Sequence, residues 1–131
     1  MKVITSSGSR KTAVARASLR DGSGKVMVNE RLLEFYQPTI YRMRMMEPLL
    51  LAKDVSKKVD LDIHINGGGS SSQADAARVA ISRALVEYEP KLAQEFLDYD
   101  RLLLVADVRF KETRKPNCHG KARAKRQKSY R

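Results

Sequence analysis

The chemistry most plainly encoded in this chain of 131 residues is the binding of negative charge. Residues 109–131 contain ten Lys or Arg and one acidic residue, so they carry +9 of the formal net charge of +11. Such a segment repels itself and has little apolar surface to bury, so we expect it to become ordered only against a polyanion. Arginine binds phosphates through paired hydrogen bonds and stacks on bases, whereas lysine acts as a point charge. The composition therefore predicts a tail that binds nucleic acid.

The length of this tail indicates which kind of nucleic acid it binds. Fully extended, its 23 residues reach roughly 75 Å. Reach and charge together favour threading into a large RNA over docking on a short duplex. A charge excess that serves only solubility is the less favoured alternative, because such charge is usually scattered along a chain.

Smaller groups of basic residues lie in the rest of the chain. Residues 9–12 read SRKT, in which two cations and two hydroxyls suit phosphate oxygens, and residues 41–44 read YRMR. The glycines at 67–69 separate a predicted strand from a predicted helix, where backbone N–H groups can cradle an anion. The phosphate-loop pattern with its lysine is absent. A tight backbone turn is therefore the favoured explanation of the glycines, and phosphate contact is the alternative.

Catalytic patterns are weak by comparison. Asp60 and Asp62 share a predicted strand face, but lysines stand close by and the favoured explanation is a solvated surface. Cys118, the only cysteine, precedes His119 in the tail, where no fixed base would activate a nucleophile. One cysteine and two histidines cannot complete a four-ligand zinc site without carboxylates. We expect no enzyme activity, no cofactor and no metal site.

The element pattern indicates one domain. Residues 10–20 alternate, with three alanines and a leucine on one face, and Asp21-Gly22 favours a tight hairpin turn to a return strand at 25–29. A third strand is predicted at 32–36, after a turn at 29–31. Residues 58–65 alternate strictly and give the clearest strand, with His64 on the polar face.

Helical signals follow on both sides of that strand. Residues 37–53 contain two prolines, which suit the first turns of short helices. Residues 74–88 show the strongest helical spacing, and Pro90 is expected to open a second helix through Leu97. Residues 102–108 form an apolar run that suits a buried strand. The pattern predicts a two-layer α/β sandwich at 1–108 and an extended basic tail at 109–131.

We also expect a soluble, intracellular protein. The first eight residues have no apolar region of the kind that signal peptides carry, and the longest apolar run, Pro48 to Ala52, is far too short to span a bilayer.

Four separated motifs resemble one family. Residues 8–16 (GSRKTAVAR) are similar to the N-terminal signature of ribosomal protein nine of the small subunit. Residues 22–29 are similar to its hairpin, and residues 67–85 to its glycine loop and following helix. The ending RQKSYR at 126–131 is similar to the archaeal and eukaryotic branch. One departure is Ser72, where the family usually has glycine before the Gln-Ala pair.

This resemblance implies a fold and a role. The fold is α+β, with a mixed, mostly antiparallel sheet, helices on one face and a left-handed β-α-β crossover. The implied role is that of a structural constituent of the cytoplasmic ribosome, which binds ribosomal RNA in the head of the small subunit and meets other head proteins. The tail is expected to reach transfer RNA in the peptidyl site. A subunit of another, RNA-processing ribonucleoprotein and a free-standing basic nucleic-acid-binding protein are the alternatives. We expect no membrane or small-molecule partner.

The resemblance and the basic residues together name the expected contacts. The terminal residues are expected nearest transfer RNA: Lys128, Ser129, Tyr130 and Arg131. The residues expected at ribosomal RNA are Arg10, Lys11, Arg16, Arg42, Arg44, Gly67, Gly68, Gly69, Arg109, Arg114, Lys115, Lys121, Arg123, Lys125 and Arg126.

Overall fold

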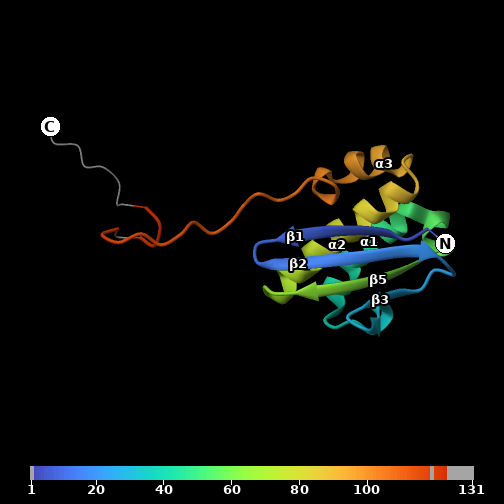
Figure 1. Cartoon of the computed structure of the whole chain (residues 1–131), viewed down its shortest axis with the longest axis horizontal. Coiled ribbons are helices and arrows are strands. Elements are labelled where there is room, and N and C mark those ends of the chain that lie inside the picture. The colour runs from blue at the N-terminus through green and yellow to red at the C-terminus, as the bar shows by residue number, and fades with distance from the viewer. Residues whose placement is uncertain (1, 119, 124–131) are drawn as a thin grey trace.

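A mixed five-stranded sheet is the centre of the computed structural model, which describes residues 2–118 and 120–123 (Figure 1). The strands are β1 (Ile4–Arg10), β2 (Ala13–Asp21), β3 (Val26–Val28), β4 (Arg31–Leu32) and β5 (Val59–Asn66). Their order across the sheet is β1-β2-β5-β3-β4; β3 is parallel to β5, and the other neighbours are antiparallel.

Three α-helices complete the domain. They are α1 (Thr39–Ala52), α2 (Ser70–Tyr88) and α3 (Leu92–Tyr99), and short 3-10 turns lie at Leu33–Phe35, Lys53–Lys58 and Arg101–Leu103. Helix α2 packs on β1, β2 and β5, while α1 and α3 pack against α2. The α+β fold with helices on one face of a mixed sheet is therefore confirmed. None of the helices in the described part of the chain has the length and apolar composition needed to cross a membrane.

The crossover between the parallel strands also follows the expectation. Strands β3 and β5 are neighbours in the sheet, and α1 lies between them in the chain. In Figure 1 both strands run from right to left, β5 lies above β3, and α1 lies behind the sheet. This arrangement makes the β3-α1-β5 connection left-handed, against the usual rule.

Small side chains bring α2 unusually close to the sheet. The alternation predicted for β2 and β5 is confirmed, since every second residue from Ala13 to Leu19 and from Val59 to Ile65 is buried beneath the helices. On α2, Ala76, Ala77, Ala80 and Ala84 are fully buried at the same interface. A Cβ atom added at Gly8 of β1 would lie 2.5 Å from the Ala76 carbonyl oxygen. The helix backbone therefore rests almost directly on β1, and only glycine fits there.

The predicted hairpin between residues 10–20 and 25–29 is wrong. Strand β5 lies between β2 and β3, so the two are not paired, and the loop at 22–25 crosses the end of β5 instead. A Cβ atom at Gly22 would lie 2.1 Å from the Asp60 carboxylate carbon. The Asp-Gly pair thus marks a close approach to Asp60, not a two-residue turn. The turn predicted at 29–31 does exist, between β3 and β4.

Asp60 holds this loop in place. Its Oδ1 accepts the backbone N–H groups of Ser23, Gly24 and Lys25 at 2.9, 3.1 and 2.9 Å. These bonds, with that of Lys25 foremost, hold the pKa of the Asp60 carboxyl below its usual value. Asp60 is therefore an anchor for the crossing loop, a role that the sequence-based interpretation of a solvated strand face did not include.

Three further expectations are corrected. Residues 102–108 do not form a buried strand: only Leu103 is fully buried, and the side chain of Val108 is 80% exposed. Strand β1 was not predicted, because its sequence ITSSGSR lacks an apolar alternation. Residues 37–53 contain one helix of 14 residues, with Pro48 inside it, where short helices were expected.

Replacing Asp60 by Asn tests the loop anchor. Because the folded state lowers the pKa of Asp60, its contribution to stability is present above about pH 4, the ordinary range of Asp, and is lost as the pH falls further. The free energy of unfolding of Asp60→Asn should therefore fall below that of the unmodified chain at pH 7, and the difference should shrink at pH 3. Urea unfolding at both pH values measures this.

Asp62→Asn is the matched control, on the same strand face but without the three backbone bonds. It should change the free energy of unfolding by about 0.5 kcal/mol or less at pH 7. Equal effects of the two substitutions would contradict the anchor.

Candidate nucleic-acid interface

One end of the sheet gathers most of the candidate residues of the body. The turn between β1 and β2 carries Lys11, which is exposed and has a φ of +54°. The glycine loop at 67–69 lies against this turn, because a Cβ atom at Gly67 would be 2.6 Å from the Thr12 carbonyl oxygen. Asp107, two residues before the tail, meets Arg10 at the same place. We call this region, formed by Arg10, Lys11 and residues 67–69 and 107–109, the cationic end.

Two of the three glycines in the loop form the backbone turn, and the third does not. Gly67 and Gly68 adopt φ values of +76° and +67°, and a Cβ atom at Gly68 would lie 2.9 Å from that of Ala13. The favoured explanation, a tight backbone turn, thus accounts for both. Gly69 differs: it has a φ of −96°, precedes α2, and faces open space at its Cβ position. Gly69 is the position of this loop at which another molecule can approach the backbone.

Arg10 and Arg44 are tied to carboxylates inside the protein. Asp75 on α2 contacts Arg44 at 3.1 Å and Arg10 at 3.9 Å, and Arg10 also contacts Asp107 at 3.3 Å. Asp107 in turn pairs with Arg109 at 2.7 Å. These five residues form one chain of alternating charge that joins α1, α2, β1 and the start of the tail. We call it the charge chain.

The charge chain decides which of its arginines remain available. Hydrogen bonds from Arg109, its side chain foremost, hold the pKa of Asp107 far below its usual range, and Arg10 adds to this. The Arg10 side chain is only 17% exposed, whereas the Arg109 side chain is 71% exposed. Arg10 therefore acts mainly as a link to the tail, while Arg109 still presents its guanidinium to solvent. The sequence offered no signal for Asp75 or for the pairing of Asp107 with Arg10, because these partners lie far apart in the chain.

Helix α1 also engages its arginines internally. Arg42 donates through Nη1 to the Glu34 carbonyl oxygen at 2.7 Å. Arg44 stacks over the Tyr41 ring at 5.6 Å from its centroid, and donates to Ser71 Oγ at 3.2 Å. Arg44 lies three residues after Tyr41, which places both side chains on the same face of α1. Both guanidiniums nevertheless have partners within the protein.

Arg16 lies apart from the cationic end, on the face of the sheet that the helices leave open. It is exposed on β2, opposite Ser7 of β1 and His64 of β5. Together with Thr5 and Ser18 these residues line a shallow depression rich in hydroxyl groups. His64 is exposed, as expected, and its Nε2 lies 3.8 Å from Asp62 Oδ2. Arg16 can reach a phosphate from this face.

The tail leaves the body as irregular chain and then turns back (Figure 1). The Lys115 N–H donates to the Lys121 carbonyl oxygen at 3.0 Å, and Arg123 pairs with Glu112. The Arg123 side chain, through its hydrogen bonds, lowers the pKa of Glu112. These two contacts close a turn that brings residues 121–123 back beside residues 112–115, where the sequence predicted extended chain.

Three predicted tail contacts lie exposed on this turn: Arg114, Lys115 and Lys121. Other predicted residues lie outside the described part of the chain: Lys125, Arg126, Lys128, Ser129, Tyr130 and Arg131. Within residues 2–118 and 120–123, no group of three or more His, Cys, Asp or Glu is placed to hold a metal ion.

Comparison with known proteins identifies the chain as a ribosomal protein. The model of the family described as Ribosomal protein S9/S16 matches residues 8–131, and the chain belongs to this family. It is thereby a structural constituent of the small ribosomal subunit, with ribosomal RNA and other ribosomal proteins as partners, and its place is the cytoplasmic ribosome.

Close relatives agree with this assignment. The small ribosomal subunit protein uS9 of Methanococcus maripaludis strain C7 is 48% identical over 134 aligned residues, which cover all of both chains. The proteins of the same name in M. maripaludis strain S2 and in Methanococcus vannielii are 48% and 46% identical, again over all of both chains.

Substitutions in the glycine loop test the distinction between its members. Gly67→Ala should lower the free energy of unfolding by about 2 kcal/mol or more, because the left-handed conformation alone costs roughly 1–2 kcal/mol for a residue with a side chain. Gly69→Ser should leave stability unchanged or slightly higher, since serine is a favourable residue at a helix N-cap. Urea unfolding at neutral pH measures both variants, and an equal loss of stability in both would contradict the assignment.

Proposed function

We propose that the chain binds ribosomal RNA in the head of the small subunit with its cationic end and tail, and that residues 128–131 contact transfer RNA in the peptidyl site. The observation that carries the proposal is the convergence of the glycine loop, Lys11 and the start of a strongly cationic tail at one end of the sheet. Membership in the ribosomal family favours this role over another ribonucleoprotein or a free-standing DNA binder.

The charge chain indicates that only some of the basic residues bind RNA, while others hold the protein together. Arg10 and Arg44 pair with Asp75 and Asp107, which fixes where the tail leaves the body. The exposed cations, by contrast, remain available to phosphate oxygens: Lys11, Arg16, Arg109, Arg114, Lys115 and Lys121. On this proposal the body and the tail neutralise phosphates together, and the tail gains further order on binding.

Salt dependence is the direct test of phosphate binding. If the chain neutralises about 6 phosphates, the logarithm of its affinity for head RNA should fall with the logarithm of salt concentration with a slope of roughly −4 to −5. Filter binding or fluorescence anisotropy across a salt series gives the slope. An affinity that ignores salt would contradict the proposal.

Matched lysine variants sharpen this test. Lys115→Ala with Lys121→Ala should reduce the steepness of the slope by about 1 for each phosphate that the variant no longer neutralises. Lys25→Ala with Lys57→Ala removes the same charge from the opposite end of the sheet and should leave the slope unchanged. If both pairs act equally, binding follows total charge and not the proposed interface.

Removal of residues 129–131 tests the contact to transfer RNA. The truncated chain should fold and enter small subunits, because it keeps the domain and most of the tail. Its subunits should bind peptidyl-site transfer RNA more weakly, by roughly tenfold to a hundredfold, as one hydrogen bond to a charged group is worth about 1.5–3 kcal/mol. Transfer RNA binding to purified subunits measures this; assembly failure would show instead that these residues serve RNA folding.

A further inference from the structure

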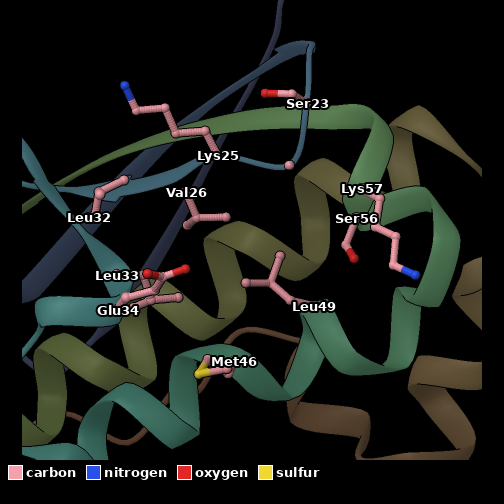
Figure 2. A pocket seen from close by; sticks show the side chains of 11 residues that line it. Ser23, Lys25, Val26, Leu32, Leu33, Glu34, Met46, Leu49, Ser56 and Lys57 are labelled. Carbon is pink, nitrogen blue, oxygen red and sulfur yellow. The ribbon is translucent and has the colours of Figure 1, made fainter.

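A cavity of about 460 Å³ lies between helix α1 and the loop at 22–25 (Figure 2). Its walls come from the loop at 22–25, β3, β4, the turn at Leu33–Phe35, helix α1 and the 3-10 turn Lys53–Lys58. Five apolar side chains line it: Val26, Leu32, Leu33, Met46 and Leu49. A cavity of this size and lining is typical of a site that receives an apolar group.

The topology separates this cavity from the cationic end. Strand β2 starts at Ala13, beside the glycine loop, and runs to Asp21, where the loop at 22–25 begins. The cavity therefore lies at the opposite end of the strands from Lys11, and the tail starts near Arg10 at that other end. Neither the proposed RNA interface nor the described part of the tail covers it.

Helix α1 carries more apolar surface than this fold buries. Met45 and Ala52 face the core, and Met46 and Leu49 line the cavity. On the outer side, Met43 and Leu50 are 62% and 69% exposed. A helix that is apolar around most of its circumference is normally buried around most of it as well. The outer face of α1 is therefore expected to be covered when the chain is in its working assembly.

We propose that this surface binds a segment of a neighbouring protein of the small ribosomal subunit. We call it the α1 groove, formed by Met43, Met46, Leu49, Leu50 and the cavity. The partner segment inserts a bulky apolar side chain into the cavity and carries an acidic residue beside it. The inference rests on the proposed function only in that the chain must occupy its place in the subunit.

The chemistry of the α1 groove favours protein over RNA. None of its four α1 residues has a charge, and burying their side chains gives no free energy against a phosphate backbone. Cores of protein interfaces, in contrast, are depleted in charge and enriched in aromatic and methionine side chains. The groove thus suits the core of a protein contact.

Charge at the rim specifies the partner further. Lys25 and Lys57 stand on the rim, and Figure 2 shows both amino groups directed away from the apolar walls. Glu34 is the one acidic residue that lines the cavity. Lys57 Nζ lies 3.6 Å from Asp54 Oδ1, so Lys25 is the rim cation with which a carboxylate next to the inserted side chain can pair.

A photo-crosslink identifies the occupant. Met43 is replaced by the photoreactive amino acid benzoylphenylalanine in the full chain, and small subunits that contain it are purified and irradiated. The expected product is an adduct with a peptide of another small-subunit protein, in which an apolar residue lies next to Asp or Glu. An adduct with RNA, an adduct with a segment lacking an acidic residue, or no adduct would each overturn the proposal.

A second photo-crosslink, also in purified small subunits, distinguishes failure of this inference from failure of the proposed function. A photoreactive residue in place of Lys11 should give an adduct with ribosomal RNA. If the chain with the photoreactive residue fails to enter subunits, or if position 11 gives no RNA adduct, the proposed function is wrong. If position 11 reacts with RNA while position 43 gives no protein adduct, the inference alone fails.

Three substitutions at exposed residues test how strongly the partner segment binds. Leu50→Glu should reduce the protein crosslink from position 43 roughly tenfold, because an apolar anchor is replaced by a charge that repels an acidic partner. Leu50→Lys should reduce it clearly less, since it can pair with the partner's carboxylate. Val3→Glu, at an exposed apolar residue away from α1, is the control and should have no effect. A greater reduction with Leu50→Lys than with Leu50→Glu would overturn the acidic partner.

Discussion

The near contact between helix α2 and the sheet is the constraint on which the rest of this structure depends. Gly8 leaves the carbonyl of Ala76 almost resting on β1, and alanines on both surfaces keep the two layers close. At this short distance the second turn of α2 brings Asp75 within reach of Arg10 at the end of β1, and of Arg44 on α1. A larger side chain at the interface would separate those partners. The thin core therefore positions the polar groups of the cationic end.

Ion pairing inside the domain divides its arginines into two groups. Within the charge chain, Arg10 and Arg44 hold elements together, whereas Arg109 at its end keeps its charge exposed, as do Lys115 and Lys121 of the tail. Net charge alone does not reveal this division. A basic protein that binds RNA also has to direct its cations, and here Asp75, Asp107 and Glu112 do so. The few acidic residues near the tail therefore help to determine which cations face the RNA.

The sequence predicted the elements whose signals are local. The alternation in β2 and β5 and the helical spacing of 74–88 are repeated many times within one element, so they identify it without its neighbours. The hairpin failed because Gly22 is required by Asp60, which lies far along the chain, and a single sequence does not show that contact. Among the site residues, Lys11 and Lys121 lie exposed as predicted, but the pairing of Arg10 with Asp107 depends on tertiary structure. The resemblance supplied the left-handed crossover, which local patterns do not encode.

The crossing loop has a consequence for the order in which the chain folds during its own synthesis. Because β5 lies between β2 and β3, the segment 22–28 has no place in the sheet until residues 59–66 have been made. The Asp60 carboxylate then fastens the loop from the later strand. The first two strands can pair as soon as they emerge, whereas the third waits for about thirty more residues. The segment 22–28 therefore joins the sheet only after the ribosome has translated residues 59–66.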